Sequence, residues 1–124
     1  MISFSIIKKI EEFELSYGSY NIYFTGGFTI QNLENLDIQL LDLVKKETIK
    51  LNEKYLKTRD IINRERAILC YTFDILQYSS LRLTINNPEI LAVKRDYNKP
   101  SFTLFSFIKK NETVDINSVN VIIK

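Results

Sequence analysis

The side chains available for chemistry are limited by the complete absence of His from the 124-residue sequence. His is the commonest general base and the commonest metal ligand, so Ser-His-Asp and Cys-His catalysis and the usual Cys/His zinc sites are excluded. The single Cys, Cys70, cannot form a disulfide within the chain. An enzyme would have to work with carboxylates, Lys, Tyr or Arg. We therefore expect a binding protein with no catalytic residue, no metal and no cofactor.

Glu47 and Glu65 are the residues best placed for carboxylate chemistry. Each falls within the apolar stripe of its own predicted helix, so both would point toward the seam if the two helices pair. Paired carboxylates can act as acid and base when burial separates their pKa values. We favour the alternative that each reaches a Lys or Arg at the edge of the seam, since structural ion pairs perturb such groups as readily as catalytic sites do. The sequence leaves open whether the two share a buried site.

An acidic and aromatic segment near the N-terminus is the main candidate for binding another protein. Residues 1–44 carry two Lys against six acids, a net charge of −4. Tyr is favoured at protein interfaces, and an acidic patch beside aromatic side chains would suit a basic partner such as a toxin or a nuclease. For the tyrosines alone we favour a simpler interpretation, in which alternate residues pack into the core and the others are surface tyrosines. The candidate contact residues are Glu11, Glu12, Glu14, Tyr17, Tyr20 and Tyr23.

A basic block at residues 45–66 supports an alternative function. It holds eight Lys plus Arg against four acids, a net charge of +4. On a helix, several of these side chains would share one edge that could contact phosphates. We favour a solvated helix face, because the helix dipole prefers bases at the end of a helix and local ion pairs occur at these spacings. The candidate nucleic-acid contacts are Lys46, Lys50, Lys54, Lys57 and Arg59.

Hydrophobic periodicity predicts helices in the middle of the chain and strands around them. Residues 2–15 fit either a helix or a strand, and we favour a short helix. Residues 19–25 alternate like a strand, and a turn at Gly26-Gly27 followed by residues 28–30 predicts a hairpin. Apolar residues at helical spacing predict one helix over residues 33–57 and a second to about residue 78. The absence of Gly and Pro from this stretch favours long helices, which would pair antiparallel.

After Ser79 the apolar period changes from 3.6 to 2. Leu81, Leu83 and Ile85 alternate with polar residues, and further strands are expected over residues 89–95, 101–109 and 119–123. The expected fold is a single α+β domain over residues 1–124. It consists of an antiparallel β-sheet, made of an N-terminal hairpin and a C-terminal four-strand meander, packed against a long helix pair. Such a meander leaves an edge strand open to self-pairing or strand addition.

Composition narrows the expected function to a small protein-binding module. No apolar run approaches the roughly 20 residues of a membrane-spanning helix, and no secretion signal is evident, so we expect a cytoplasmic protein with no membrane partner. We interpret it as an inhibitor or immunity-type, antitoxin-like protein that neutralises a partner protein by blocking it. The alternative is a small nucleic-acid-binding protein that uses the basic block. Homo-oligomerisation is left open.

Overall fold

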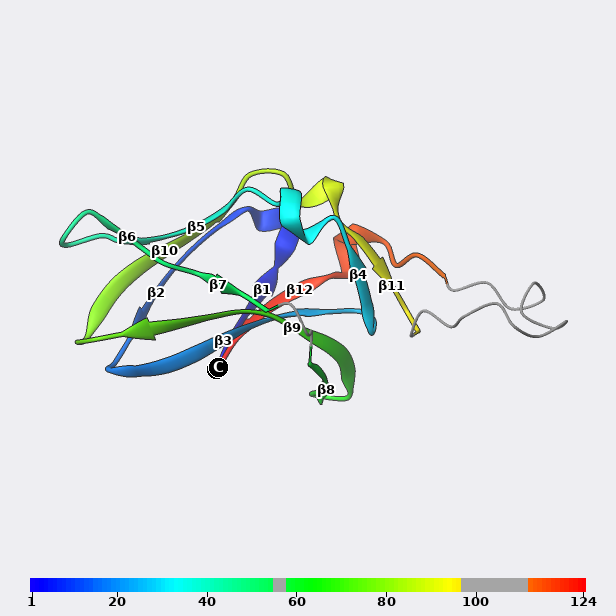
Figure 1. Cartoon of the computed structure of the whole chain (residues 1–124), viewed down its shortest axis with the longest axis horizontal. Coiled ribbons are helices and arrows are strands. Elements are labelled where there is room, and N and C mark those ends of the chain that lie inside the picture. Colours follow the sequence, from blue (N-terminus) through cyan, green and yellow to red (C-terminus); the bar gives the residue numbers. More distant parts are fainter. Residues whose placement is uncertain (55–57, 97–111) are drawn as a thin grey trace, which may run out of the picture.

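The computed structural model describes residues 1–54, 58–96 and 112–124, and this part of the chain consists mostly of antiparallel β-strands (Figure 1). Its helical elements are four 3-10 turns of three residues each. The expected α+β fold with a long helix pair is therefore wrong. None of the described helices is long and apolar enough to cross a membrane. The 3-10 turns are η1 (Ile6–Lys8), η2 (Leu33–Asn35), η3 (Pro88–Ile90) and η4 (Ile116–Ser118).

The strands form three antiparallel sheets. The six-stranded sheet has the order β1 (Ile2–Ser5), β12 (Asn120–Ile123), β3 (Gly18–Thr25), β9 (Glu65–Ile75), β7 (Asn52–Glu53), with β8 (Arg59–Ile62) also paired to β9. The four-stranded sheet has the order β2 (Ile10–Leu15), β10 (Ser79–Ile85), β5 (Ile38–Asp42), β6 (Glu47–Ile49). A two-stranded sheet joins β4 (Thr29–Gln31) to β11 (Ala92–Lys94).

The main core lies between the two larger sheets, which form the upper and lower layers of Figure 1. Alternate side chains of a strand point to opposite faces, so each layer contributes every second residue. On β10 the predicted alternation is confirmed, because Leu81, Leu83 and Ile85 are completely buried. The facing layer contributes the fully or almost fully buried side chains Ile22, Phe24, Ile68, Phe73, Val121 and Ile123.

The two predicted helices are in fact strands joined by tight turns. Asn63 and Arg64 have positive φ values of 51° and 68° and form the two-residue turn between β8 and β9, as a type I′ hairpin requires. In the turn between β5 and β6, the Asp42 carboxylate accepts hydrogen bonds from the backbone N–H groups of Val44 and Lys45, both at 3.0 Å. Gly and Pro are not needed where Asn and Asp side chains stabilise turns, so their absence did not indicate helix.

Two further predictions about the sheets were wrong in their pairing. Strand β3 forms as predicted, but β4 pairs with β11, so there is no hairpin across Gly26-Gly27. Strands β10, β11 and β12 overlap three of the predicted strand segments, but they belong to three different sheets and form no meander. The strand expected over residues 101–109 lies outside the described residues. Residues 2–15 form β1, η1 and β2 instead of a helix.

Candidate partner-binding surface

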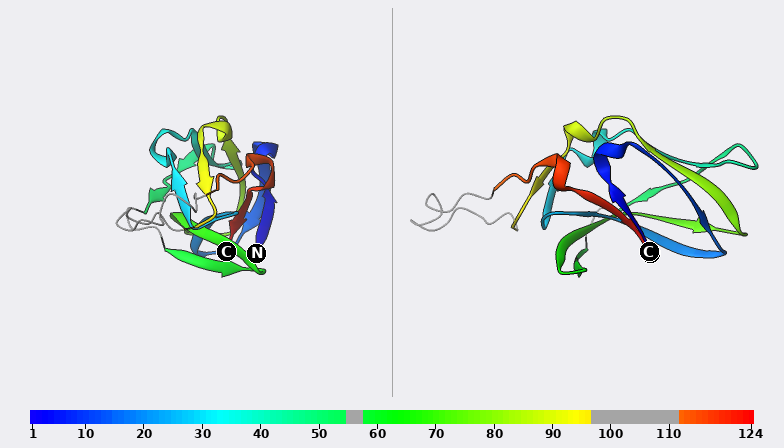
Figure 2. Two further views of the ribbon diagram at one scale, coloured as in Figure 1. Left: turned by 90° about the vertical axis from the view of Figure 1, so that its right-hand side faces the viewer. Right: turned by 180° about the vertical axis from the view of Figure 1, so that it is seen from behind.

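Three turns lie at the same end of the molecule, which we call the turn end. It consists of residues 16–17 between β2 and β3, 43–46 between β5 and β6, and 76–78 between β9 and β10 (Figures 1 and 2). Two side-chain hydrogen bonds join the segment around the first turn to the segment around the third. The Ser19 hydroxyl donates to the Asp74 carboxylate at 2.7 Å, and the Tyr78 hydroxyl donates to the Glu14 carboxylate.

The turn end presents four large apolar side chains to solvent. Tyr17, Val44, Leu76 and Tyr78 are 76, 78, 81 and 64% exposed. They make up half of the eight exposed large hydrophobic residues in the described part of the chain. Single exposed apolar residues are ordinary, but several of them at one end of a protein favour an interaction site there.

A hollow of about 200 Å³ separates two of these turns and has an acidic wall. The residues that line it include three acids, Asp42, Glu47 and Asp74, and one base, Lys45. The rest of the lining is mixed, with Ile49, Ile75 and Leu76 beside Thr48, Gln77 and Ser79. The turn end therefore combines exposed apolar surface with an excess of negative charge.

Strand β2 extends this acidic character away from the turn end. Its exposed outer face carries Glu12 and Glu14, whereas Glu11 is half-buried and pairs with Lys8. One oxygen of Glu12 accepts hydrogen bonds from Arg82 Nε and Nη2 at 3.0 and 2.7 Å. Among the ion pairs of the described residues, none involves Glu14, whose carboxylate instead accepts the Tyr78 hydroxyl and raises the pKa of that phenol.

The three candidate tyrosines have different environments. Tyr17 lies in the turn end, beside the acidic strand. The Tyr20 ring stacks on Phe73 with centroids 5.7 Å apart, and its hydroxyl donates to the Ser16 carbonyl at 3.0 Å. Tyr23 is only 7% exposed and belongs to a second hydrophobic cluster. The structure thus leaves Tyr17 exposed in the turn that follows β2, and it places Tyr20 and Tyr23 in packing roles.

Three residues of the turn end were missed from the sequence: Val44, Leu76 and Tyr78. Leu76 falls within the second predicted helix, which contains no turn at this position. In a strand-turn-strand connection it lies at the tip and is exposed. Val44, Leu76 and Tyr78 are exposed because the segments around them are strands joined by turns.

The candidate nucleic-acid contacts do not form the common edge expected of a helix. Lys46 lies in the turn end with a φ of 56°, Lys50 lies between β6 and β7, and Lys54 follows β7. Lys57 lies outside the described residues. Lys50 lines a groove of about 420 Å³ whose other charged residues are all acidic, which is unfavourable for phosphate. These acidic residues are Glu34, Asp37 and Glu53.

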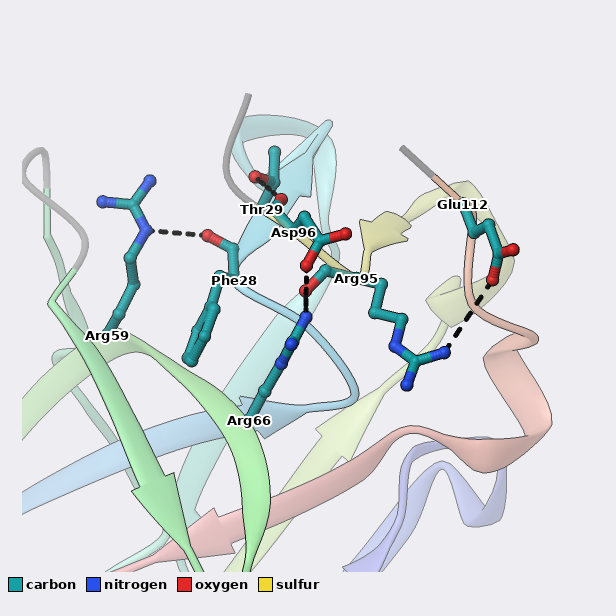
Figure 3. A network of polar contacts seen from close by, with 7 residues as sticks. All are labelled: Phe28, Thr29, Arg59, Arg66, Arg95, Asp96 and Glu112. Carbon is teal, nitrogen blue, oxygen red and sulfur yellow. Dashed lines mark hydrogen bonds and ion pairs between the residues drawn. The ribbon is translucent and has the colours of Figure 1, made fainter. Parts of the chain in front are cut away.

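Arg59, the last of these candidates, belongs to a polar network at the opposite end of the molecule (Figure 3). Its Nε donates to the Phe28 carbonyl at 2.8 Å. Arg66 stacks its guanidinium 5.0 Å from the centroid of the Phe28 ring, donates to the Arg95 carbonyl at 2.7 Å and pairs with Asp96. These bonds fasten the two-stranded β4–β11 sheet to the β8–β9 hairpin, so the network has a structural role.

Glu47 and Glu65 do not form the shared buried site that a helix pair would have allowed. Both side chains are exposed, and they begin strands of different sheets, β6 and β9. In the described part of the chain, no group of three His, Cys, Asp or Glu residues is arranged to hold a metal ion. Cys70 is completely buried in β9.

Comparisons of this chain with protein-family models, with curated proteins and with solved structures found no match. The turn end and strand β2 together form the candidate partner-binding surface. Its distinguishing features are the four apolar side chains of the turn end, the acidic hollow between two turns, and the acidic outer face of the adjoining strand β2.

Proposed function

We propose that this protein is a non-catalytic protein-binding module of the cytoplasm. It neutralises a basic partner protein by covering a surface that the partner needs, as inhibitor and immunity-type proteins do. The observation that carries this proposal is the turn end, where Tyr17, Val44, Leu76 and Tyr78 are exposed together beside acidic residues.

The apolar side chains of the turn end would supply affinity. Complete burial of a large apolar side chain contributes about 1.5–3 kcal/mol, and a few such anchors carry most of the binding energy of an interface. Tyr17 and Tyr78 also keep a hydroxyl at the surface, which suits an interface that is apolar at its centre and polar at its rim. The neighbouring carboxylates would attract a basic partner and discriminate against acidic proteins.

The test is capture of a partner from the native host, followed by reconstitution with purified proteins. The wild-type protein, Leu76→Ser and Tyr17→Ser serve as baits, and Ile61→Ser is the matched control, because Ile61 is 57% exposed but lies on β8, away from the turn end. We expect a basic protein to be retained by the wild type and by Ile61→Ser. Each turn-end variant should bind the purified partner at least about tenfold more weakly, which corresponds to about 1.4 kcal/mol.

The reconstituted complex must also show inhibition and salt dependence. An equimolar amount of this protein should abolish the partner's activity, and higher salt should weaken the association because surface charges are screened. Equal loss of binding by Ile61→Ser, or capture without inhibition, would contradict the proposal. A polarisation assay with labelled nucleic acid at low salt should show no binding, whereas tight, salt-sensitive binding there would favour the nucleic-acid alternative.

A further inference from the structure

Strand β2 forms one edge of the four-stranded sheet, and within the described ranges it pairs only with β10. Its residues alternate between exposed and half-buried along the whole strand. Strand β1 does not cover this edge, because β1 and β2 diverge from η1 (Figure 2). An uncovered edge exposes backbone N–H and C=O groups that another strand can pair with.

Two backbone hydrogen bonds establish which groups of β2 face that edge. The Ile85 N–H donates to the Lys9 carbonyl at 2.7 Å, and the Leu43 N–H donates to the Ser80 carbonyl at 2.9 Å on the other side of β10. Hydrogen-bonded pairs alternate along an antiparallel ladder, so odd-numbered residues of β10 face β2. With the observed register, their hydrogen-bonded partners on β2 are Glu11, Phe13 and Leu15.

The remaining residues of β2, which are Ile10, Glu12 and Glu14, therefore direct their backbone groups toward the open edge. Their side chains are also the exposed ones. At Glu12 and Glu14, a backbone N–H and C=O that face the open edge and an exposed carboxylate are therefore presented on the same residue. A strand added at this edge would align with these three residues and place alternate side chains beside the two carboxylates.

We propose that an extended segment of the basic partner adds to the sheet as a fifth strand along β2, with Lys or Arg opposite Glu12 and Glu14. This inference rests on the proposed function and specifies how the partner is recognised. The cations would continue an existing alternation of charge across the sheet, since Arg82 of β10 already pairs with Glu12 from the other side. Main-chain hydrogen bonds give affinity in this mode, and the alternate side chains give specificity.

A second copy of this chain is a poorer occupant of the same edge. Antiparallel pairing of two β2 strands centred on Glu12 would place the Glu12 carboxylates opposite each other, and a parallel arrangement would bring like residues close together. Like charges directly opposite each other destabilise a strand pair. The charge of β2 thus protects the edge against self-pairing while leaving it open to a basic strand.

The first experiment maps the edge with a defined probe. The probe is a blocked nine-residue peptide in which Lys alternates with Val and Thr, titrated into the 15N-labelled full chain. We expect the amides of Ile10, Glu12 and Glu14 to shift and to exchange more slowly with solvent, and those of Glu11, Phe13 and Leu15 to change little. The same peptide with Glu in place of Lys should bind at least tenfold more weakly. Absence of changes at β2 at millimolar peptide would overturn the inference.

Two substitutions at one position separate the backbone from the charge. Glu12→Gln removes the carboxylate and keeps the outward N–H, so it should weaken peptide binding by a few-fold. Glu12→Pro also removes the N–H, and it should abolish binding while leaving the ladder with β10 intact, because Pro is tolerated where an edge-strand N–H faces solvent. If Glu12→Pro lowers the melting temperature, Ile10→Pro at the first residue of the strand makes the same test. Equal binding by the Pro and Gln variants would refute strand addition.

The captured partner distinguishes this inference from the proposed function. A partner that loses affinity for Leu76→Ser but binds Glu12→Pro as tightly as the wild type would overturn strand addition and leave the protein-binding function in place. Failure to capture any basic protein would remove the proposed function itself. Self-association of the wild type that Glu12→Pro abolishes would assign the edge to a second copy and overturn the inference.

Discussion

The turn between β8 and β9 allows a direct test of the strand assignment in the region where helix was expected. Arg64 has a φ of 68°, in the left-handed region that costs a residue with a side chain about 1–2 kcal/mol. Gly adopts this conformation freely, although it makes the unfolded chain more flexible by about 0.4–1 kcal/mol. We therefore expect Arg64→Gly to increase the free energy of unfolding by about 0.5–1 kcal/mol.

The same substitution would have the opposite effect in a helix. Gly in a helix interior costs about 1 kcal/mol relative to a good helix former, so the sign of the change distinguishes the two structures. For 124 residues, an unfolding entropy of about 2.1 cal/mol/K per residue is about 0.26 kcal/mol/K, and the expected gain raises the melting temperature by about 2–4 °C.

Chemical denaturation and thermal melting measure this effect, with Glu65→Gly as the matched control. Glu65 is exposed and immediately follows Arg64, but it is the first residue of β9 and is extended. There Gly should lower the free energy of unfolding by about 0.5–1 kcal/mol. A loss of stability in Arg64→Gly similar to that in Glu65→Gly would refute the type I′ turn.

Three further predictions follow from buried positions. A Cβ atom on Gly27 would lie 2.0 Å from the Lys94 carbonyl oxygen. Gly27→Ala should therefore force β4 away from β11 and lower the free energy of unfolding, measured by denaturation, by about 3 kcal/mol. A loss below about 0.5 kcal/mol would contradict this contact. Burial, with smaller contributions from Cys70 and Glu53, raises the pKa of Tyr71 above its ordinary 10.0. The folded protein then keeps a proton that the unfolded chain releases, so the contribution of Tyr71 to stability should be constant below pH 10 and fall above it by up to about 1.4 kcal/mol per pH unit, and Tyr71→Phe should reduce that slope. Cys70 is fully buried, so a thiol reagent should modify it only as fast as the protein opens; rapid modification of the native protein would show that β9 is packed differently.

Part of the candidate site could be identified from residue types and their order. The acidic run at Glu11, Glu12 and Glu14 is a local property, and Glu12 and Glu14 are exposed although the segment is a strand and not a helix. Tyr17 was a candidate because Tyr is favoured at protein interfaces, and it is exposed in the structure. Leu76 and Tyr78 could not be found, because their exposure depends on the turn between β9 and β10, which the helical interpretation did not contain.

The sequence by itself determined the strands with strictly alternating apolar residues, and it excluded His-dependent catalysis and the usual Cys/His zinc sites. Strict alternation in β10 has only one compatible structure, and the absence of His needs no fold to interpret. It could not determine the structure of residues 33–78, where apolar residues fit both a helical and an extended period. Tertiary structure decided that region, because β9 becomes a central strand only by pairing with β3, which lies some 50 residues earlier in the chain. It also decided the candidate surface, since three turns far apart in sequence lie at the same end only when the two sheets pack.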